Sequence, residues 1–166
     1  MSKLLRKVRQ GRWLDEDAEL LADPLADLNT HSNELSVYEI QADEANLTDV
    51  IVGLASGRDS LVNVDYILID RATVEAEGFI LQVTRGATPY KTANDWHMDI
   101  VGLTARRLVE LAELMKAGLT DDEERRLRRV QRAAVRAHLE EACRHGTLDR
   151  QRLDPRLKKH INPDLD

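Results

Sequence analysis

The sequence predicts an α+β fold in which a small mixed three-stranded sheet with a βαβ unit is packed by a C-terminal helical hairpin and short N-terminal helices. Two strand-like runs, Leu35–Ile40 and Val64–Asp70, flank a segment with helical periodicity, which is the pattern of a βαβ unit. Two further helical segments follow in the C-terminal half. At 166 residues the chain fits a single domain, divided into an arm (1–33), a sheet region (34–92) and a helical region (93–166).

The N-terminal arm is expected to cross the core as short helical pieces. Pro24 interrupts its apolar pattern, and the turn-forming run from Asn29 to Asn33 ends it. The residues expected to contact the core are Trp13, Leu14, Leu20, Leu21, Leu25 and Leu28.

The strand-helix-strand unit follows directly. Leu35–Ile40 alternates its apolar side chains between two faces, as a short strand does. Between Asp43 as the expected N-cap and Gly57 as the expected stop, apolar residues recur at helical spacing. Val64–Asp70 contains an unbroken apolar run, typical of a strand buried on both faces. We expect the two strands to be parallel neighbours joined by a right-handed crossover.

A third strand and a long helix complete the predicted central part. Residues 71–77 are too few for a second crossover, so Phe79–Thr84 is expected to return antiparallel beside the second strand. Asn94 or Asp95 can cap a helix that begins near Trp96 and carries apolar residues around most of its circumference. That helix is predicted to be the buried centre of the domain.

The second helix of the predicted hairpin starts at a strong local signal. Gly118 can end the preceding helix, and Thr120 with Glu123 has the spacing of a capping box. We expect this helix to run from about Asp121 to His145 and to pack antiparallel against its predecessor. A last short helix is expected from about 149 to 160.

Charge is distributed unevenly along a chain whose formal net charge is −6. Residues 1–12 contain five bases and no acid, residues 13–118 contain 20 acids against 7 bases, and residues 119–166 contain 12 bases against 10 acids. Such asymmetry allows two explanations: pairing of opposite surfaces within the protein, or binding of an external polyanion.

The candidate partner-binding residues are five arginines that share one flank of the predicted C-terminal helix, namely Arg125, Arg128, Arg129, Arg132 and Arg136. No acid lies between the first and the last of them, so a compensating charge from outside the helix is expected. Three interpretations stay open: a solvated face, carboxylates of the same protein, of a second copy or of a partner, and the phosphates of a nucleic acid.

Two constellations of side chains are candidate metal sites. His138, Glu141 and His145 share a helix face, but the histidines are about 10 Å apart along the axis, so a polar patch is the preferred interpretation. A second set of side chains could serve a metal-dependent hydrolase, although its spacing does not match a nuclease-type site cleanly. The set consists of His97, Asp99, Asp65, Asp70, Glu75 and Glu77, with Gln82 and Arg85 nearby. No metal ligand, catalytic residue or cofactor is therefore predicted.

The expected function is that of a non-catalytic protein-binding or regulatory protein: an adaptor, an inhibitor or immunity-type protein, or a small subunit of a cytoplasmic assembly. A protein partner or self-association is expected. The alternatives are a nucleic-acid-associated regulator that uses the arginine-striped helix, and a small metal-dependent hydrolase. A cytoplasmic location is expected from the single cysteine, Cys143, and from the absence of a signal-peptide pattern. No membrane partner is expected, because charges break the longest apolar segment, Ile100–Leu114.

Overall fold

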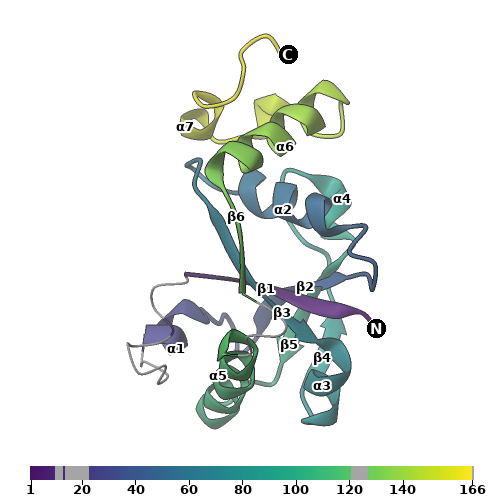
Figure 1. Cartoon of the computed structure of the whole chain (residues 1–166), viewed down its shortest axis with the longest axis vertical. Helices are drawn as coiled ribbons and strands as arrows, with labels where there is room; N and C mark the ends of the chain where they lie inside the picture. The colour runs from purple at the N-terminus through teal and green to yellow at the C-terminus, as the bar shows by residue number, and fades with distance from the viewer. Residues whose placement is uncertain (10–12, 14–22, 121–126, 166) are drawn as a thin grey trace.

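The structure is a computed structural model that describes residues 1–9, 13, 23–120 and 127–165. Over these residues it is α+β, with one open sheet of six antiparallel strands in the order β4-β5-β2-β1-β3-β6 (Figure 1). The strands are β1 (Lys3–Val8), β2 (Leu35–Ile40), β3 (Val64–Asp70), β4 (Ile80–Val83), β5 (His97–Val101) and β6 (Leu127–Val130). The α+β class is confirmed, but the predicted mixed three-stranded sheet is wrong.

Helices cover both faces of this sheet. They are α1 (Asp23–Asp27), α2 (Leu47–Ser56), α3 (Arg71–Ala76), α4 (Lys91–Asn94), α5 (Ala105–Thr120), α6 (Arg132–Arg144) and α7 (Pro155–Lys158), with a 3₁₀ turn at Arg150–Arg152. Within the part of the chain described, no helix has both the length and the apolar character needed to cross a membrane.

Strand β1 is the largest departure from the predicted topology. The sequence predicted helical pieces at the N-terminus, whereas Lys3–Val8 lies in the middle of the sheet, with Leu5 opposite Tyr38 of β2 and Leu68 of β3. Because β2 and β3 are each antiparallel to β1, they run in the same direction, but they do not pair with each other. The predicted strand-helix-strand unit therefore exists, but the direct parallel pair is wrong, because β1 is inserted between its strands.

The local predictions for that unit hold well. β2 and β3 have the predicted bounds, and α2 lies inside the predicted helical segment with Gly57 as its C-cap. The N-cap is Asn46, not Asp43. Asp43 instead accepts a hydrogen bond from the backbone N–H of Ala45 in the preceding turn.

The third predicted strand has a different neighbour, and the long helix starts later than predicted. β4 pairs with β5, with Leu81 opposite Ile100, and does not pair with β3. β5 occupies the first turns of the predicted helix, because Met98 and Ile100 face the core with the two-residue period of a strand. Gly102, with a φ of +69°, separates β5 from α5, which begins only at Ala105.

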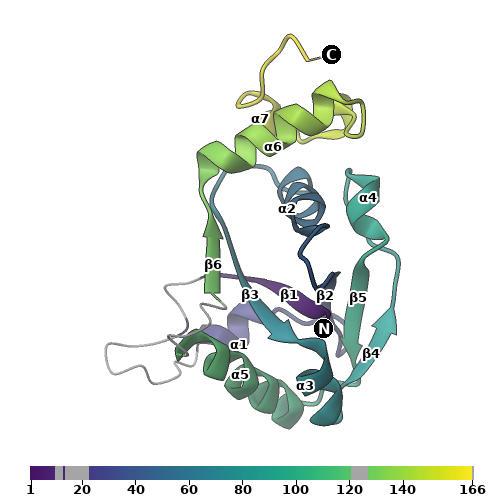
Figure 2. The same ribbon diagram turned by 45° about the vertical axis from the view of Figure 1, so that its right-hand side comes forward.

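The predicted helical hairpin is also wrong. α5 extends to Thr120, so Gly118 lies within it, and the capping-box residue Glu123 falls outside the described residues. Leu127–Val130 is an edge strand, with Val130 opposite Val64 of β3, and α6 begins only at Arg132. The two helices lie on opposite sides of the sheet, as Figure 2 shows.

Two apolar cores result, one on each face of the sheet. Helices α2, α6 and α7 cover the face that includes Leu5, Tyr38 and Leu68. Helices α1, α3 and α5 cover the opposite face, where Trp13 and Leu28 are buried as the arm prediction required. Leu25 packs against this core and is partly buried, whereas the remaining three leucines of the predicted arm lie outside the described residues (Leu14, Leu20 and Leu21).

Candidate functional site

The structure does not bring the five candidate arginines onto one flank. Arg128 and Arg129 belong to strand β6, where successive side chains point to opposite faces, and Arg132 and Arg136 belong to α6. Arg125 lies outside the described residues. The predicted rod with a single cationic side is therefore wrong over Leu127–Val130. The role of these arginines in partner binding stays a prediction. The shared helix flank on which that prediction was based is not present in the structure.

Three of these arginines bind carboxylates of the same chain. Nη1 of Arg128 is 2.6 Å from Oε2 of Glu44, and Nε of Arg136 is 2.8 Å from Oε1 of Glu140. Arg129 holds Asp65 through two contacts, of 2.6 and 2.9 Å. The hydrogen bonds to Glu44 and Asp65 raise the pKa of Arg128 and Arg129, respectively. For these three residues the compensating charge lies within the protein.

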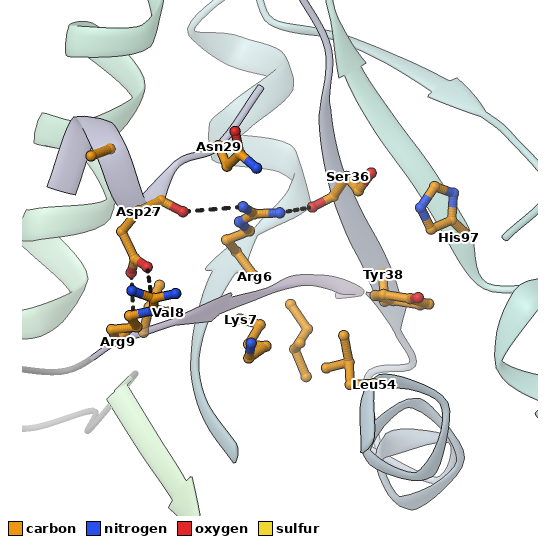
Figure 3. Close-up of a pocket in the computed structure, with 12 residues that line it drawn as sticks. Arg6, Lys7, Val8, Arg9, Asp27, Asn29, Ser36, Tyr38, Leu54 and His97 are labelled. Carbon is orange, nitrogen blue, oxygen red and sulfur yellow. Dashed lines mark hydrogen bonds and ion pairs between the residues drawn. The ribbon is translucent and has the colours of Figure 1, made fainter. Parts of the chain in front are cut away.

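A pocket of about 450 Å³ lies where β1 separates from β2 (Figure 3). β1 pairs with β2 only as far as Leu5, but it pairs with β3 as far as Val8. The Arg6 guanidinium spans the gap, with Nη1 donating to the Ser36 carbonyl at 2.8 Å. This side chain occupies the place where a continuous ladder would put backbone hydrogen bonds. We call the hollow the strand-gap pocket.

The acid in the wall of this pocket is already occupied by other donors. Oδ2 of Asp27 accepts hydrogen bonds from the backbone N–H of Arg9 at 2.6 Å and from Nε1 of Trp13 at 3.0 Å. Its backbone carbonyl accepts from Nη2 of Arg6 at 3.3 Å. The Asp27 carboxylate therefore holds the Arg9 backbone and the Trp13 indole in place in the pocket wall. It forms no ion pair with Lys7 in the structure.

Lys7 lies between the strand-gap pocket and a second hollow of about 780 Å³ that is also lined by Arg58 and Arg152. Among the described residues, neither Lys7 nor Arg58 has a side-chain hydrogen bond or an ion pair, and Nε of Arg58 is buried without a partner. Burial lowers the pKa of Lys7 to about 8, helped by the positive charges of Arg58 and Arg9 and opposed by Asp27. Within the part of the chain that the structure describes, two cations thus approach each other without an ion-paired acid.

The acids of the second hollow are directed elsewhere. Oδ2 of Asp59 is 3.2 Å from Nη1 of Arg156. Asp154 is the N-cap of α7 and accepts a hydrogen bond from the backbone N–H of the same arginine at 2.8 Å. Both acids therefore contact Arg156, and neither forms an ion pair with Lys7 or Arg58 in the structure.

A hydrogen-bonded polar cluster lies beside the strand-gap pocket. Ser36 and Thr84 donate to the two carboxylate oxygens of Asp99 at 2.9 and 2.6 Å, and Oγ1 of Thr84 is 2.8 Å from Nδ1 of His97. Since the single hydroxyl hydrogen of Thr84 goes to Asp99, Nδ1 of His97 must be the donor in the third contact. In a neutral imidazole, Nε2 of His97 is then the ring nitrogen with the lone pair.

Two members of the pocket lining extend this cluster. His97 and Tyr38 both line the strand-gap pocket, and their rings meet edge to face with centroids 5.2 Å apart. Burial raises the pKa of Tyr38, with a further contribution from Asp99, so the phenol stays protonated at neutral pH. This wall can therefore offer a hydroxyl donor and an imidazole acceptor to a ligand.

The other constellations do not form a metal centre. Nε2 of His145 is 2.5 Å from Oε1 of Glu141, and both residues line a pocket of about 280 Å³ with His138. Over the residues that the structure describes, no three His, Cys, Asp or Glu side chains are placed to hold a metal ion. At the ends of β3, Asp65 pairs with Arg129, and nearby Glu75 pairs with Arg71.

Sequence reasoning singled out His97 and Asp99, which the structure brings together, but it missed Lys7, Arg58 and Tyr38. The one local signal was the run of five bases without an acid in residues 1–12. No protein-family model, curated protein or solved structure matches this chain.

Proposed function

We propose that this protein is a non-catalytic binding protein that captures a small anionic ligand, bearing a carboxylate or phosphate group, between Lys7 and Arg58. The observation that carries the proposal is the approach of these two cations at the junction of two hollows, where the described residues supply neither with an ion pair. An anion placed between them would supply the counter-charge that the described residues do not provide.

The charge of the lining supports an anion over a cation. The strand-gap pocket is lined by three bases, Arg6, Lys7 and Arg9, against one acid, Asp27, and this acid is engaged by Arg9 and Trp13. The whole chain has a formal net charge of −6, so the local excess of positive charge runs against the overall composition. A concave site of one sign attracts ligands of the opposite sign.

The volume of the hollows favours a small molecule. The strand-gap pocket, at about 450 Å³, falls in the range of ligand pockets, roughly 300–1,000 Å³. The Arg58 guanidinium suits the planar or tetrahedral oxygens of carboxylate and phosphate, and Lys7 adds a compact positive charge. Tyr38 and His97 would contact the uncharged part of the ligand. We place this binding protein in the cytoplasm, in line with its single and buried cysteine, Cys143.

The nucleic-acid alternative loses its main support, because it required the arginine-striped helix. Arg128 and Arg129 lie on an edge strand and are paired with Glu44 and Asp65. The hydrolase alternative required free carboxylates at the strand ends, of which Asp65 is ion-paired. We therefore retain the non-catalytic class.

The experiment is isothermal titration calorimetry, with thermal unfolding, of the full chain against inorganic phosphate and citrate at constant ionic strength. Wild type is expected to bind at least one of them, and Lys7→Gln and Arg58→Gln are each expected to weaken binding by about tenfold or more, because a charge-assisted hydrogen bond is lost. Arg106→Gln is the matched control, since this side chain is 89% exposed on α5. Absence of binding, or equal binding by all four proteins, would reject the proposal.

A further inference from the structure

Lys7, Tyr38 and His97 share one face of the sheet. In the antiparallel register Leu5 of β1 lies opposite Tyr38 of β2, and Tyr38 lies opposite His97 of β5. Directly opposed residues point to the same face, and so do residues two apart on one strand, so Lys7 joins Leu5 on that face. Leu5 and Tyr38 belong to the core that α2 covers. The cation and the two rings therefore line the strand-gap pocket from one side of the sheet.

The cationic pair and the two rings are separated by the length of a small molecule. Lys7 lies two residues along β1 from the position that pairs with Tyr38, a distance of about 7 Å in an extended strand. Arg58 lies two residues after the end of α2, which covers this same face. Figure 3 shows Lys7 near the middle of the pocket, and Tyr38 and His97 together at one end. A ligand with its anionic group on Lys7 and Arg58 therefore needs only a few carbon atoms to reach Tyr38.

The Tyr38 hydroxyl is a donor that the described residues leave unused. Only 7% of this residue is exposed, yet its side chain has no hydrogen bond or ion pair within the described chain. Burial raises the pKa of the phenol, so the hydroxyl keeps its proton at neutral pH. The hydroxyl of a buried tyrosine usually has a hydrogen-bond partner. The Tyr38 hydroxyl is therefore available to a group that enters the pocket.

His97 supplies the complementary acceptor. Its Nδ1 donates to Oγ1 of Thr84 at 2.8 Å, because the hydroxyl proton of Thr84 goes to Asp99. A neutral His97 therefore presents a lone pair at Nε2, and none of the described residues donates a hydrogen bond to it. The Tyr38 and His97 rings meet edge to face, so the donor and the acceptor border the same part of the pocket.

We infer that the ligand is a small hydroxylated phosphate or carboxylate, whose hydroxyl group accepts a hydrogen bond from Tyr38 and donates one to Nε2 of His97. A hydroxyl group fits this pair because it can donate and accept at once, whereas a carbonyl oxygen only accepts and an ammonium group only donates. The inference rests on the proposed function, since the anionic group of the same ligand must bind Lys7 and Arg58.

The test compares probes that differ in their hydroxyl groups. The full chain is titrated calorimetrically at neutral pH and constant ionic strength with glycerol phosphate and propyl phosphate, and with glycerate and propanoate. Wild type is expected to bind the hydroxylated member of at least one pair about tenfold more tightly, because the other member leaves a buried donor and an acceptor unpaired. The pair that binds more tightly identifies the anionic group as phosphate or carboxylate.

Two variants test the two contacts. Tyr38→Phe removes only the hydroxyl, and His97→Asn keeps an amide donor for Thr84 but leaves no acceptor at the position of Nε2. Each is expected to weaken binding of the hydroxylated probe by about tenfold and to leave binding of its partner probe within about twofold. Tyr90→Phe is the matched control, because Tyr90 is also buried but lines a different pocket, and it should keep the preference. Circular dichroism checks that each variant is folded.

The results separate failure of this inference from failure of the proposed function. Lys7→Gln is expected to weaken both members of a pair by a similar factor and to keep the preference between them. Equal binding of the two members of each pair by wild type, or a preference that survives Tyr38→Phe, would overturn the hydroxyl contact and leave the anion site standing. No binding of any of the four probes, or of phosphate and citrate, would overturn both.

Discussion

The guanidinium of Arg128 donates from Nη1 to Oε2 of Glu44 at 2.6 Å, and this contact joins edge strand β6 to the turn that precedes α2. The two residues are 84 positions apart in the sequence. Glu44 has a φ of +58°, and its other carboxylate oxygen is 3.7 Å from Nζ of Lys3 on β1. One carboxylate therefore connects the first and the last strands of the chain.

Acidification should weaken this connection. The hydrogen bond from Arg128 lowers the pKa of Glu44, so the folded state holds the ionised carboxylate more strongly than the unfolded state does. The resulting stability is present above the usual glutamate pKa and is lost as the pH falls through the lower folded value. Glu44→Gln should reduce the free energy of unfolding by about 0.5–1 kcal/mol at neutral pH, a magnitude typical of a solvent-screened pair.

Urea unfolding at neutral pH, and again well below the usual glutamate pKa, measures this effect. The difference between wild type and Glu44→Gln should shrink at the lower pH, because both side chains are then uncharged. Glu113→Gln is the control, since Glu113 is exposed and makes no ion pair within the described chain. A deficit of Glu44→Gln that is the same at both pH values would contradict the assignment.

Gly53 should be intolerant of any side chain. A Cβ atom at this position of α2 would lie 2.3 Å from Cβ of Ala93 in α4, far inside contact distance. Gly53→Ala should therefore lower the free energy of unfolding by about 1–3 kcal/mol through overpacking. Gly57→Ala is the control, because its nearest neighbour would be 3.9 Å away and its φ of −81° suits alanine.

Denaturant unfolding of both variants checks this prediction, and a second variant tests its mechanism. Removing the opposing methyl group in the double variant Gly53→Ala with Ala93→Gly should recover part of the loss. Equal stability of Gly53→Ala and Gly57→Ala would show that α2 and α4 do not pack as closely as the structure has them.

The sequence could predict the elements whose signal is local. The alternation in Leu35–Ile40, the apolar run in Val64–Asp70 and the helical spacing between them each identify an element without reference to the rest of the chain. Strand β1 has no comparable local signal for its place, because insertion between β2 and β3 is decided by pairing with residues at least 30 positions away. The predicted topology was wrong because it left β1 out of the sheet.

Short strands beside helices account for the other errors. Leu127–Val130 consists largely of good helix formers, so its pairing with β3 overrides local propensity. In His97–Val101 the apolar residues merge with those of α5 into an apparent helical pattern, which hides the true boundary at Gly102. The candidate site was missed for a related reason: Lys7 and Arg58 approach only after β1 enters the sheet.

Thr84 should hold the polar cluster beside the strand-gap pocket in place. Its hydroxyl donates to Asp99 and accepts from His97, so Thr84→Val, which preserves the shape of the side chain, removes both contacts. Asp99 is 8% exposed and would lose one of its two donors. The free energy of unfolding should fall by about 1–3 kcal/mol, the usual cost of a partly unsatisfied buried group.

Ser36→Ala provides the comparison, because it removes the hydrogen bond to the other Asp99 oxygen and leaves the contact with His97 in place. Nitrogen chemical shifts of the His97 ring should change in Thr84→Val and stay near wild type in Ser36→Ala. Identical His97 spectra in wild type and Thr84→Val would remove Thr84 as the acceptor of the Nδ1 proton.

Lys7 should lower the free energy of unfolding, although we propose that it binds the ligand. Burial and the neighbouring charges of Arg58 and Arg9 lower its pKa to about 8 from the ordinary lysine value of 10.5. Between these two values the unfolded chain holds a proton that the folded chain has released, so the stability of wild type should rise with pH across this window. Below about pH 8 the unfavourable charge is fully present.

Lys7→Met should therefore be more stable than wild type at neutral pH, by on the order of 1 kcal/mol, because solvent in the two pockets screens part of the penalty. Its stability should also vary less between about pH 8 and 10.5. Lys159→Met, at an exposed position in the C-terminal segment, should change neither quantity. Phosphate or citrate at a concentration that saturates wild type should reverse the order of stability, since wild type gains more binding energy than the weaker-binding variant. A Lys7→Met protein less stable than wild type at neutral pH without added anion would mean that a carboxylate already neutralises this lysine, and the argument for an anionic ligand would fail with it.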